Sequence, residues 1–183
     1  MRITGAVLCG GASSRMGRDK ATLDLRGRPM VEWVVDAMKE AGAATVVALG
    51  DRPDLQLPVL VDREPGSGPL AAIIGAIEQY GTLLVCPCDV PMVSSQLLRE
   101  IISSAGAAKE PVVLAHSGRL EPLIGLYKEE SLELLKIGYS KGARGPKMAL
   151  NRQDYRTVHV APDCVQNVNT PEDFESLFSK FEL

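Results

Sequence analysis

The sequence has no apolar run that approaches the roughly 18 residues needed by a membrane-spanning helix. Its opening, MRITGAVLCGG, has an apolar part too short for a signal peptide, so we expect a cytoplasmic protein. Positive charge is not in excess either, because the net charge is −3 at neutral pH. That balance argues against a general nucleic-acid-binding protein, which would present a basic face. A small phosphorylated ligand remains compatible with it, since such a ligand needs only local positive charge.

The usual spacings of metal ligands are also missing. Cys86 and Cys88 are separated by a single proline, which is a shorter spacing than common zinc-binding knuckles use. The two histidines, His116 and His159, stand apart from each other and from the cysteines in the sequence. A structural metal or a disulfide is therefore the less favoured interpretation. We expect the four cysteines to be small buried apolar residues of a protein in a reducing compartment.

What the sequence does contain is a regular alternation of short apolar segments with segments of helical periodicity. Its 183 residues favour one domain, and a hydrophobic content of 45% is enough for a globular core. The predicted strands lie at residues 3–9, 45–49, 58–62, 82–86, 111–115, 122–127 and 157–160. The predicted helices lie at residues 29–41, 69–80, 94–105, 129–137 and 170–181, with a further short one near 147–150.

This alternation predicts an α/β protein with a parallel sheet covered by helices on both faces, in three layers. One connection departs from this pattern of strands joined by helices. A short polar link, HSGRLE, joins the predicted strands at 111–115 and 122–127, and its length suits a hairpin better than a helical crossover. We therefore expect one antiparallel pair and a mixed, mostly parallel sheet.

The segment LCGGASSRMGRDK, residues 8–20, combines glycine with positive charge directly after the first predicted strand. Its glycine spacing fits neither a Walker loop nor a dinucleotide-binding fingerprint. Even so, Gly10 and Gly11 follow the carboxyl end of a strand, where open parallel sheets bind ligands, and glycines let backbone amides approach phosphate oxygens. Arg15 and Lys20 supply positive charge. We interpret the segment as a phosphate-binding loop rather than a plain turn with solvated basic residues.

Polar side chains mark three other segment ends. Asp89 follows the most uniformly apolar strand and faces the same edge as Gly10, so it is a candidate ligand of Mg²⁺, which prefers carboxylate oxygens together with substrate phosphates. Asp62 ends another strand and could accept hydrogen bonds from a base or a ribose. For both aspartates, an ordinary turn residue is an equally good interpretation of the local sequence. Asn167 and Asn169 precede a predicted helix, where they could cap it or donate to a ligand.

Together, LCGGASSRMGRDK, VLVDREPGSGPLAA, LLVCPCDVPMV and VQNVNTPEDF resemble the molybdenum cofactor guanylyltransferase family, the enzymes that attach GMP to molybdopterin. The first motif alone indicates only the broader nucleotidyltransferase superfamily, whereas PCDVP combined with NVNTPED is more specific. The resemblance implies a Rossmann-like nucleotidyltransferase fold with GTP and molybdopterin as substrates. Two positions depart from the usual family pattern: Ala72 stands where many members have glycine, and the loop at Asp51 lacks an asparagine that many members have.

The resemblance also implies which residues form the site. The expected nucleotide-binding residues are Leu8, Cys9, Gly10, Gly11, Lys20, Asp62 and Asp89. Asp89 is expected to hold the Mg²⁺ ion bound to GTP, and the expected catalytic groups are Asp89, Lys20 and Arg15. Gly68, Asn167 and Asn169 match positions on the pterin side. The family role further suggests transient contact with proteins that mature molybdoenzymes.

The implied reaction is attack by the terminal phosphate of molybdopterin on the α-phosphorus of GTP, with pyrophosphate as the leaving group. An anionic nucleophile needs no strong general base, which agrees with the lack of a convincing catalytic histidine or cysteine. The alternatives are CMP transfer to molybdopterin, nucleotidyl transfer to a sugar phosphate, and a non-catalytic nucleotide-binding protein that delivers the cofactor. The Leu-x-Gly-Gly opening resembles the guanylyl type. The joint presence of Arg15, Lys20 and Asp89 favours an enzyme.

Overall fold

The computed structural model of the chain describes residues 2–10, 20–61 and 66–180. Its strands are β1 (Thr4–Leu8), β2 (Thr45–Leu49), β3 (Val59–Leu60), β4 (Leu83–Pro87), β5 (Val112–His116), β6 (Leu120–Tyr127) and β7 (Tyr155–His159). They form one seven-stranded sheet in the order β3-β2-β1-β4-β6-β5-β7. Only β6 runs against its neighbours, β4 and β5, and the other recorded pairs are parallel. The expected mixed, mostly parallel sheet and its hairpin are confirmed.

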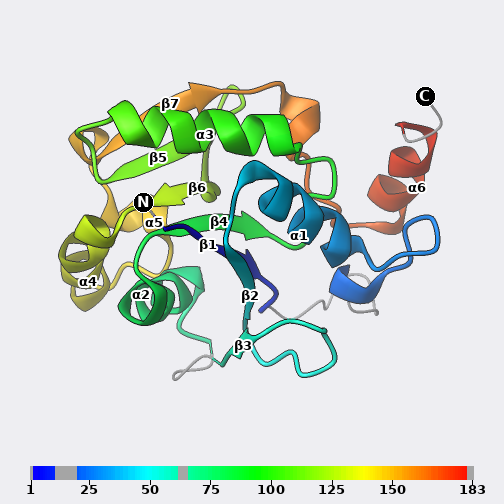
Figure 1. Cartoon of the computed structure of the whole chain (residues 1–183), viewed down its shortest axis with the longest axis horizontal. Helices are drawn as coiled ribbons and strands as arrows, with labels where there is room; N and C mark the ends of the chain where they lie inside the picture. The colour runs from blue at the N-terminus through cyan, green and yellow to red at the C-terminus, as the bar shows by residue number, and fades with distance from the viewer. Residues whose placement is uncertain (1, 11–19, 62–65, 181–183) are drawn as a thin grey trace.

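Helices cover both faces of this sheet (Figure 1). The α-helices are α1 (Met30–Ala41), α2 (Pro69–Tyr80), α3 (Ser95–Ala107), α4 (Leu132–Ser140), α5 (Pro146–Ala149) and α6 (Pro171–Lys180). Short 3-10 helices lie at η1 (Lys20–Thr22), η2 (Glu129–Ser131), η3 (Arg152–Asp154) and η4 (Pro162–Val165). Helices α1 and α3 pack on one face of the sheet, and α2, α4 and α5 pack on the other. The described helices include none that is long and apolar enough to cross a membrane.

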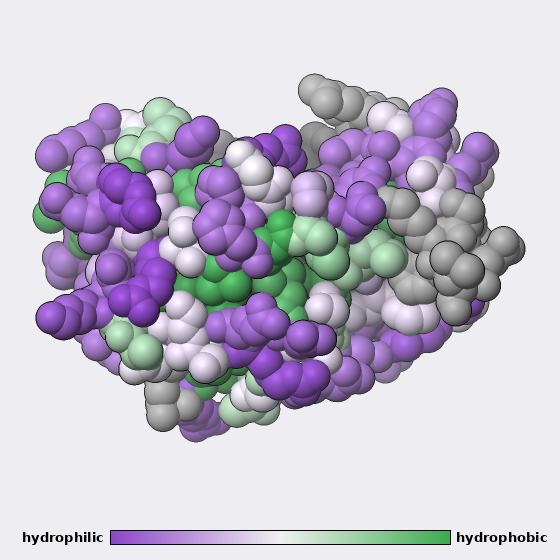
Figure 2. Space-filling model, turned by 90° about the horizontal axis from the view of Figure 1, so that it is seen from above, coloured by the Kyte–Doolittle hydropathy of each residue, from purple (hydrophilic) through white to green (hydrophobic). Residues whose placement is uncertain are grey.

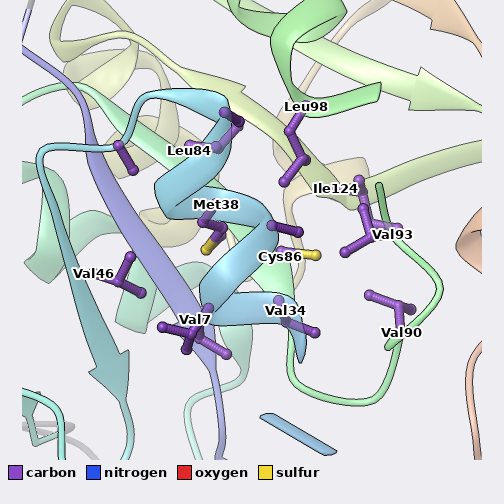
Figure 3. Close-up of a cluster of buried hydrophobic side chains, with 14 of the residues drawn as sticks. Val7, Val34, Met38, Val46, Leu84, Cys86, Val90, Val93, Leu98 and Ile124 are labelled. Atoms are coloured by element: carbon purple, nitrogen blue, oxygen red, sulfur yellow. The ribbon is translucent and has the colours of Figure 1, made fainter. Parts of the chain in front are cut away.

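The strands at the middle of the sheet are buried on both faces, and this explains their uniformly apolar sequences. On the α1 side, Val34 and Met38 lie against Val7, Leu84 and Cys86 of β1 and β4 (Figure 3). The alternate residues of the same strands pack against α2 on the opposite face. At the edge, β7 presents a more polar sequence, YRTVH. Seen from the α3 and β7 side, the surface is mostly hydrophilic with a hydrophobic band across its middle (Figure 2).

The helix ends follow the expected signals with small differences. Helix α1 begins at Met30, so Pro29 is its N-cap rather than a residue of its first turn, and Gly42 ends it in the left-handed conformation (φ 111°). Pro69 opens α2, and the Ser94 side chain accepts a hydrogen bond from the Leu97 amide at 3.2 Å at the start of α3. The segment predicted as one helix at 129–137 is divided between η2 and α4.

Helix α6 packs apart from the two main core clusters. Leu177 of α6 joins Leu25, Met30 and Val168 in a third cluster of buried residues, against which Trp33 packs. The helix is capped as expected, because the Thr170 hydroxyl accepts from the Asp173 amide at 3.1 Å and the Asp173 carboxylate accepts from the Thr170 amide at 3.0 Å. This cluster fixes α6 beside the start of α1 (Figure 1).

Candidate active site

The carboxyl ends of β1 and β4 bring two of the predicted segments side by side. The Cys88 amide donates to the Leu8 carbonyl at 3.1 Å, which continues the β1–β4 ladder by one step beyond the paired residues Leu8 and Pro87. Similarly, the Cys9 amide donates to the Leu49 carbonyl at 3.0 Å. The residues that follow, Gly10 and Asp89, are therefore held at the same edge of the sheet, as the alternation of strands and helices predicts.

Gly10 lies against a second glycine. A Cβ atom added to Gly50 would stand 3.0 Å from the Gly10 amide nitrogen, and Gly50 has a φ of +122°. Gly50 therefore allows the end of β2 to approach the start of the glycine-rich loop closely. Three predicted site residues, Gly11, Arg15 and Asp62, lie outside the described residues, and their expected functions stay predictions.

Asp89 stands at the centre of a polar network. Its Oδ2 atom lies 3.3 Å from the Lys20 Nζ atom, and its Oδ1 atom accepts a hydrogen bond from the Asn167 Nδ2 atom at 3.0 Å. Lys20 also donates to the Asn169 Oδ1 atom at 2.5 Å. The backbone takes part as well, since the Val168 amide donates to the Asp89 carbonyl at 2.8 Å. Four residues proposed from three separate motifs are thus brought together by direct contacts.

The ion pair in this network is largely shielded from water, whereas Asn169 is exposed. The side chains of Lys20 and Asp89 retain only 18% and 16% of their exposure. In such surroundings, an ion pair is weakly screened and removal of one partner leaves the other charge poorly compensated. The ammonium group of Lys20 sits on a flexible side chain, so it can leave the Asp89 carboxylate and pair with the phosphate of a ligand at the same edge of the sheet. The arrangement suits the binding of a charged, phosphorylated ligand.

The Asp89 carboxylate fits Mg²⁺ as a ligand. It offers hard oxygen atoms at the edge where Gly10 is held, and both oxygens are already oriented by Lys20 and Asn167. Mg²⁺ is commonly held by one or two carboxylates while substrate phosphates and waters complete its octahedron. Asp89 could therefore hold the ion jointly with a bound triphosphate.

The surroundings of Cys86 and Cys88, the two cysteines nearest to Asp89 in the sequence, raise the pKa of each thiol and so favour its protonated form. The hydrogen bond between the thiols of Cys88 and Cys9, together with burial, raises the pKa of Cys88 well above its usual range. Burial raises the pKa of Cys86 in the same way. All four cysteines of the chain are free. Cys9 and Cys86 are buried as expected, whereas Cys88 and Cys164 are only partly buried and pack against the edge of the same hydrophobic cluster.

Gly68 has contacts of its own, away from the Asp89 network. It is the N-cap of α2 with a φ of +82°, and an added Cβ atom would stand 2.5 Å from the Arg144 carbonyl oxygen. That carbonyl accepts a hydrogen bond from the Leu70 amide at 3.1 Å. Within the described residues, no recorded contact joins Gly68 to Asn167 or Asn169. Close packing of the chain at Arg144 is therefore sufficient to require glycine here.

A polar pocket of about 510 Å³ lies beside Asn167 and Asn169. Its walls come from the β5–β6 hairpin, from η4 and the residues that follow it, and from the first turn of α6. Sequence reasoning missed the hairpin wall, which includes Arg119 and Glu121, because HSGRLE was interpreted only as a polar link. The one available signal is Glu121 itself, a carboxylate placed directly before Pro122, where the polar link ends and the next strand was predicted to begin.

Known proteins resemble this chain over most of its length. Residues 5–158 match the family of MobA-like NTP transferase domains. A molybdenum cofactor guanylyltransferase from Xanthomonas euvesicatoria is 34% identical over 95% of this chain and 93% of its own length. Another, from Ectopseudomonas mendocina, is 33% identical over 91% of this chain and 87% of its own length. The solved structure of molybdopterin-guanine dinucleotide biosynthesis protein A from Archaeoglobus fulgidus superposes with a TM-score of 0.83, covering 98% of each chain at 22% identity.

Proposed function

Because the chain belongs to the family of MobA-like NTP transferases, we propose that it transfers GMP from GTP to the terminal phosphate of molybdopterin and releases pyrophosphate. The observation that carries the proposal is the network around Asp89. A carboxylate suited to Mg²⁺, a lysine and two asparagines gather at the edge of the sheet where Gly10 ends the first strand. The choice of GMP as the transferred group and of molybdopterin as its acceptor follows the names of the two relatives, both molybdenum cofactor guanylyltransferases.

The proposed reaction needs charge neutralisation and orientation more than it needs a base. The attacking phosphate is already an anion, so the main barriers are repulsion between like charges and the entropy of alignment. Leu8, Cys9 and Gly10 bind the nucleotide, and the Lys20 Nζ atom exchanges its contacts with Asp89 and Asn169 for phosphate oxygens. Asp89 holds Mg²⁺, which when bound offsets negative charge on the phosphates. Gly11 and Asp62 complete the nucleotide site, and Arg15 is a catalytic group that stabilises charge on the leaving pyrophosphate.

On the other side of Asp89, Asn167 and Asn169 bind the acceptor. Their contacts with Asp89 and Lys20 support this assignment, because they connect the acceptor side to the metal side through single hydrogen bonds. For Gly68 we propose an indirect effect, since its close approach to Arg144 shapes the start of α2. Residues 1–183 act as one nucleotidyltransferase domain. The cytoplasmic location and the transient contact with molybdoenzyme maturation proteins stay predictions.

The test is pyrophosphate release from GTP or CTP in the presence of molybdopterin and Mg²⁺. We expect release with GTP and little with CTP. A thermal-shift panel of GTP, CTP, ATP and UTP provides an independent measurement, because a nucleotide at about 100 times its Kd adds roughly 2.7 kcal/mol to the free energy of unfolding. Selective stabilisation by CTP would indicate a cytidylyltransferase. GTP binding without pyrophosphate release would indicate a non-catalytic protein.

A further inference from the structure

Glu121 is a buried carboxylate in the wall of the polar pocket. Only 9% of the residue is exposed. The Ser117 hydroxyl donates to its Oε1 atom at 2.6 Å, and the Arg119 Nε atom donates to the same oxygen at 2.9 Å. From the described part of the chain, no hydrogen bond reaches the Oε2 atom. This oxygen is not among the buried, unpaired side-chain atoms of the described residues, so it stays open toward the pocket, where a ligand can donate a hydrogen bond to it.

The backbone around Glu121 is built to hold it in place. The β5–β6 pairing shifts register between Leu114 and Ala115, so that Leu114 pairs with Gly125 while Ala115 pairs with Glu121. This bulge contains Pro122, whose carbonyl accepts a hydrogen bond from the buried Tyr127 hydroxyl. Bulges of this kind redirect side chains and are common beside active sites. The position of Glu121 is therefore a defined feature of the hairpin.

The donor that suits such a carboxylate is a pair of adjacent N–H groups. The 2-amino-4-oxo-pyrimidine edge of a pterin offers a ring N–H next to an exocyclic amine, and the two lone pairs of the open Oε2 atom can accept from these neighbouring donors. Guanine carries the same edge, so both substrates of the proposed reaction share this chemistry. The expected positions of the two rings in the protein distinguish guanine from the pterin. Most of the predicted nucleotide-binding residues lie at the end of β1 or after it, whereas Glu121 lies in β6, and β4, which Asp89 follows, stands between these strands.

We propose that Glu121 recognises the amino-pyrimidinone edge of the acceptor's pterin ring in this pocket. Arg119, whose side chain is 76% exposed, orients the carboxylate through its contact with Oε1. Asn167 and Asn169 line the same pocket and reach Asp89 and Lys20, so a ring held here lies next to the phosphate-transfer site. This inference rests on the proposed function, because it takes the pterin as the acceptor.

The first experiment uses the fluorescence of two small ligands. Pterin has the 2-amino group, and lumazine has an oxo group in its place. We expect the wild-type protein to bind pterin roughly 10–100-fold more tightly than lumazine, the range for a hydrogen bond to a charged group. Glu121→Gln removes one acceptor and introduces a donor, and it should abolish this preference. Glu130→Gln, an exposed matched control on η2, should retain it.

The contrary outcomes are distinct. If the wild-type protein does not distinguish pterin from lumazine, or if Glu121→Gln keeps the preference, the proposal is wrong. A purely structural glutamate would lower the melting temperature of the variant without changing this ratio.

A second measurement separates the pterin from guanine. In pyrophosphate-release assays, Glu121→Gln should raise the KM for molybdopterin at least about 10-fold while the KM for GTP stays within twofold. A raised KM for GTP alone would assign the carboxylate to guanine and overturn the inference. If the wild-type protein is inactive with GTP but still prefers pterin through Glu121, the proposed function fails and the pterin site stands.

Discussion

Asp89 owes its position to partners that are remote in the sequence. Lys20 precedes it by 69 positions and Asn167 follows it by 78. Each of these side chains satisfies part of the hydrogen-bonding capacity of a mostly buried carboxylate. At the residue scale, the site is therefore an interdependent set, in which a change at one member alters the electrostatic surroundings of the others.

Loss of the charge on Lys20 or on Asp89 should lower the turnover of the enzyme strongly. We expect Lys20→Ala or Asp89→Asn to lower kcat at least about 100-fold, the scale of one lost electrostatic group in a transition state. The measurement is pyrophosphate release at saturating GTP, molybdopterin and Mg²⁺. Lys136→Ala is the matched control, because Lys136 pairs with Glu78 between α4 and α2, and it should retain full activity. Near-normal turnover in either site variant would refute the assigned function of that residue.

The carboxylate at the start of α6 gives a pH dependence with a definite sign. Hydrogen bonds from the backbone amides of Asn169 and Thr170 lower the pKa of the Asp173 carboxyl below its usual range. A lowered pKa in the folded state means that this stabilisation is complete above the unfolded pKa. It is lost as the pH falls through the folded one.

Asp173→Asn should therefore lower the free energy of unfolding at pH 7 by about 1 kcal/mol, the usual effect of a lost helix cap. The difference from wild type should shrink below about pH 4. Urea unfolding at pH 7 and pH 3 measures both. Glu172→Gln, in the same helical turn, should show a smaller effect because its side chain makes no recorded cap bond. A constant difference at the two pH values would contradict the explanation.

At the scale of elements, most strands and helices could be predicted because one physical signal dominates each of them. Strand β4 is apolar throughout because it is buried on both faces, and α3 starts where Ser94 caps it. Strand β3 was predicted to span 58–62 but has only Val59 and Leu60 in the ladder. It lies at the edge of the sheet, where pairing on a single side leaves the extent of a strand weakly determined by its composition.

The site divides in the same way. Lys20, Asp89, Asn167 and Asn169 could be identified because each follows or precedes a recognisable element within a specific motif. Glu121 could not, because a glutamate in a short polar link has the same appearance as a solvated turn residue. Its position depends on the bulge in the β5–β6 pairing, and its pocket on the residues of η4 that line the opposite wall, neither of which a local pattern encodes.

Comparing Gly66 with Gly68 shows how the chain at Arg144 constrains the start of α2. Gly66 and Gly68 have nearly equal φ values, +85° and +82°, but an added Cβ atom meets nothing within 4 Å at Gly66 and meets the Arg144 carbonyl oxygen at Gly68. Both alanine variants should lose about 1–2 kcal/mol from backbone strain. Gly68→Ala should lose at least about 1 kcal/mol more through the clash at the start of α2. Urea denaturation compares them, and equal losses would show that the contact with Arg144 has no energetic effect.

At the scale of the whole molecule, the hydrophobic core is divided unequally. Two large clusters fill the two faces of the sheet, while the cluster beneath α6 contains few buried residues. The only tryptophan of the chain, Trp33, packs against this small cluster and donates its indole N–H to the Leu25 carbonyl at 3.2 Å. Intrinsic fluorescence therefore reports on the region that joins α6 to α1.

Weakening the small cluster beneath α6 should let that region unfold at a lower urea concentration than the sheet. Leu177→Ala removes a buried side chain of α6, and we expect the Trp33 fluorescence transition in urea to move below the far-UV circular dichroism transition. Leu97→Ala, a matched truncation in the large α1-side cluster, should shift both transitions together by about 2–4 kcal/mol. Coincident transitions in Leu177→Ala would mean that α6 and the sheet unfold as one cooperative unit.

The two asparagines that complete the network around Asp89 are among the last parts of the site to be synthesised. Asn169 contacts a lysine 149 positions earlier in the chain. A ribosome extends the chain from its N-terminus, so β1, β4 and Asp89 emerge long before these partners do. A nascent chain halted before Asn167 would carry Lys20 and Asp89 without the two asparagine side chains that contact them. If the proposed site assignment holds, catalytic competence is expected only late in translation, once Asn167 and Asn169 have been added to the chain.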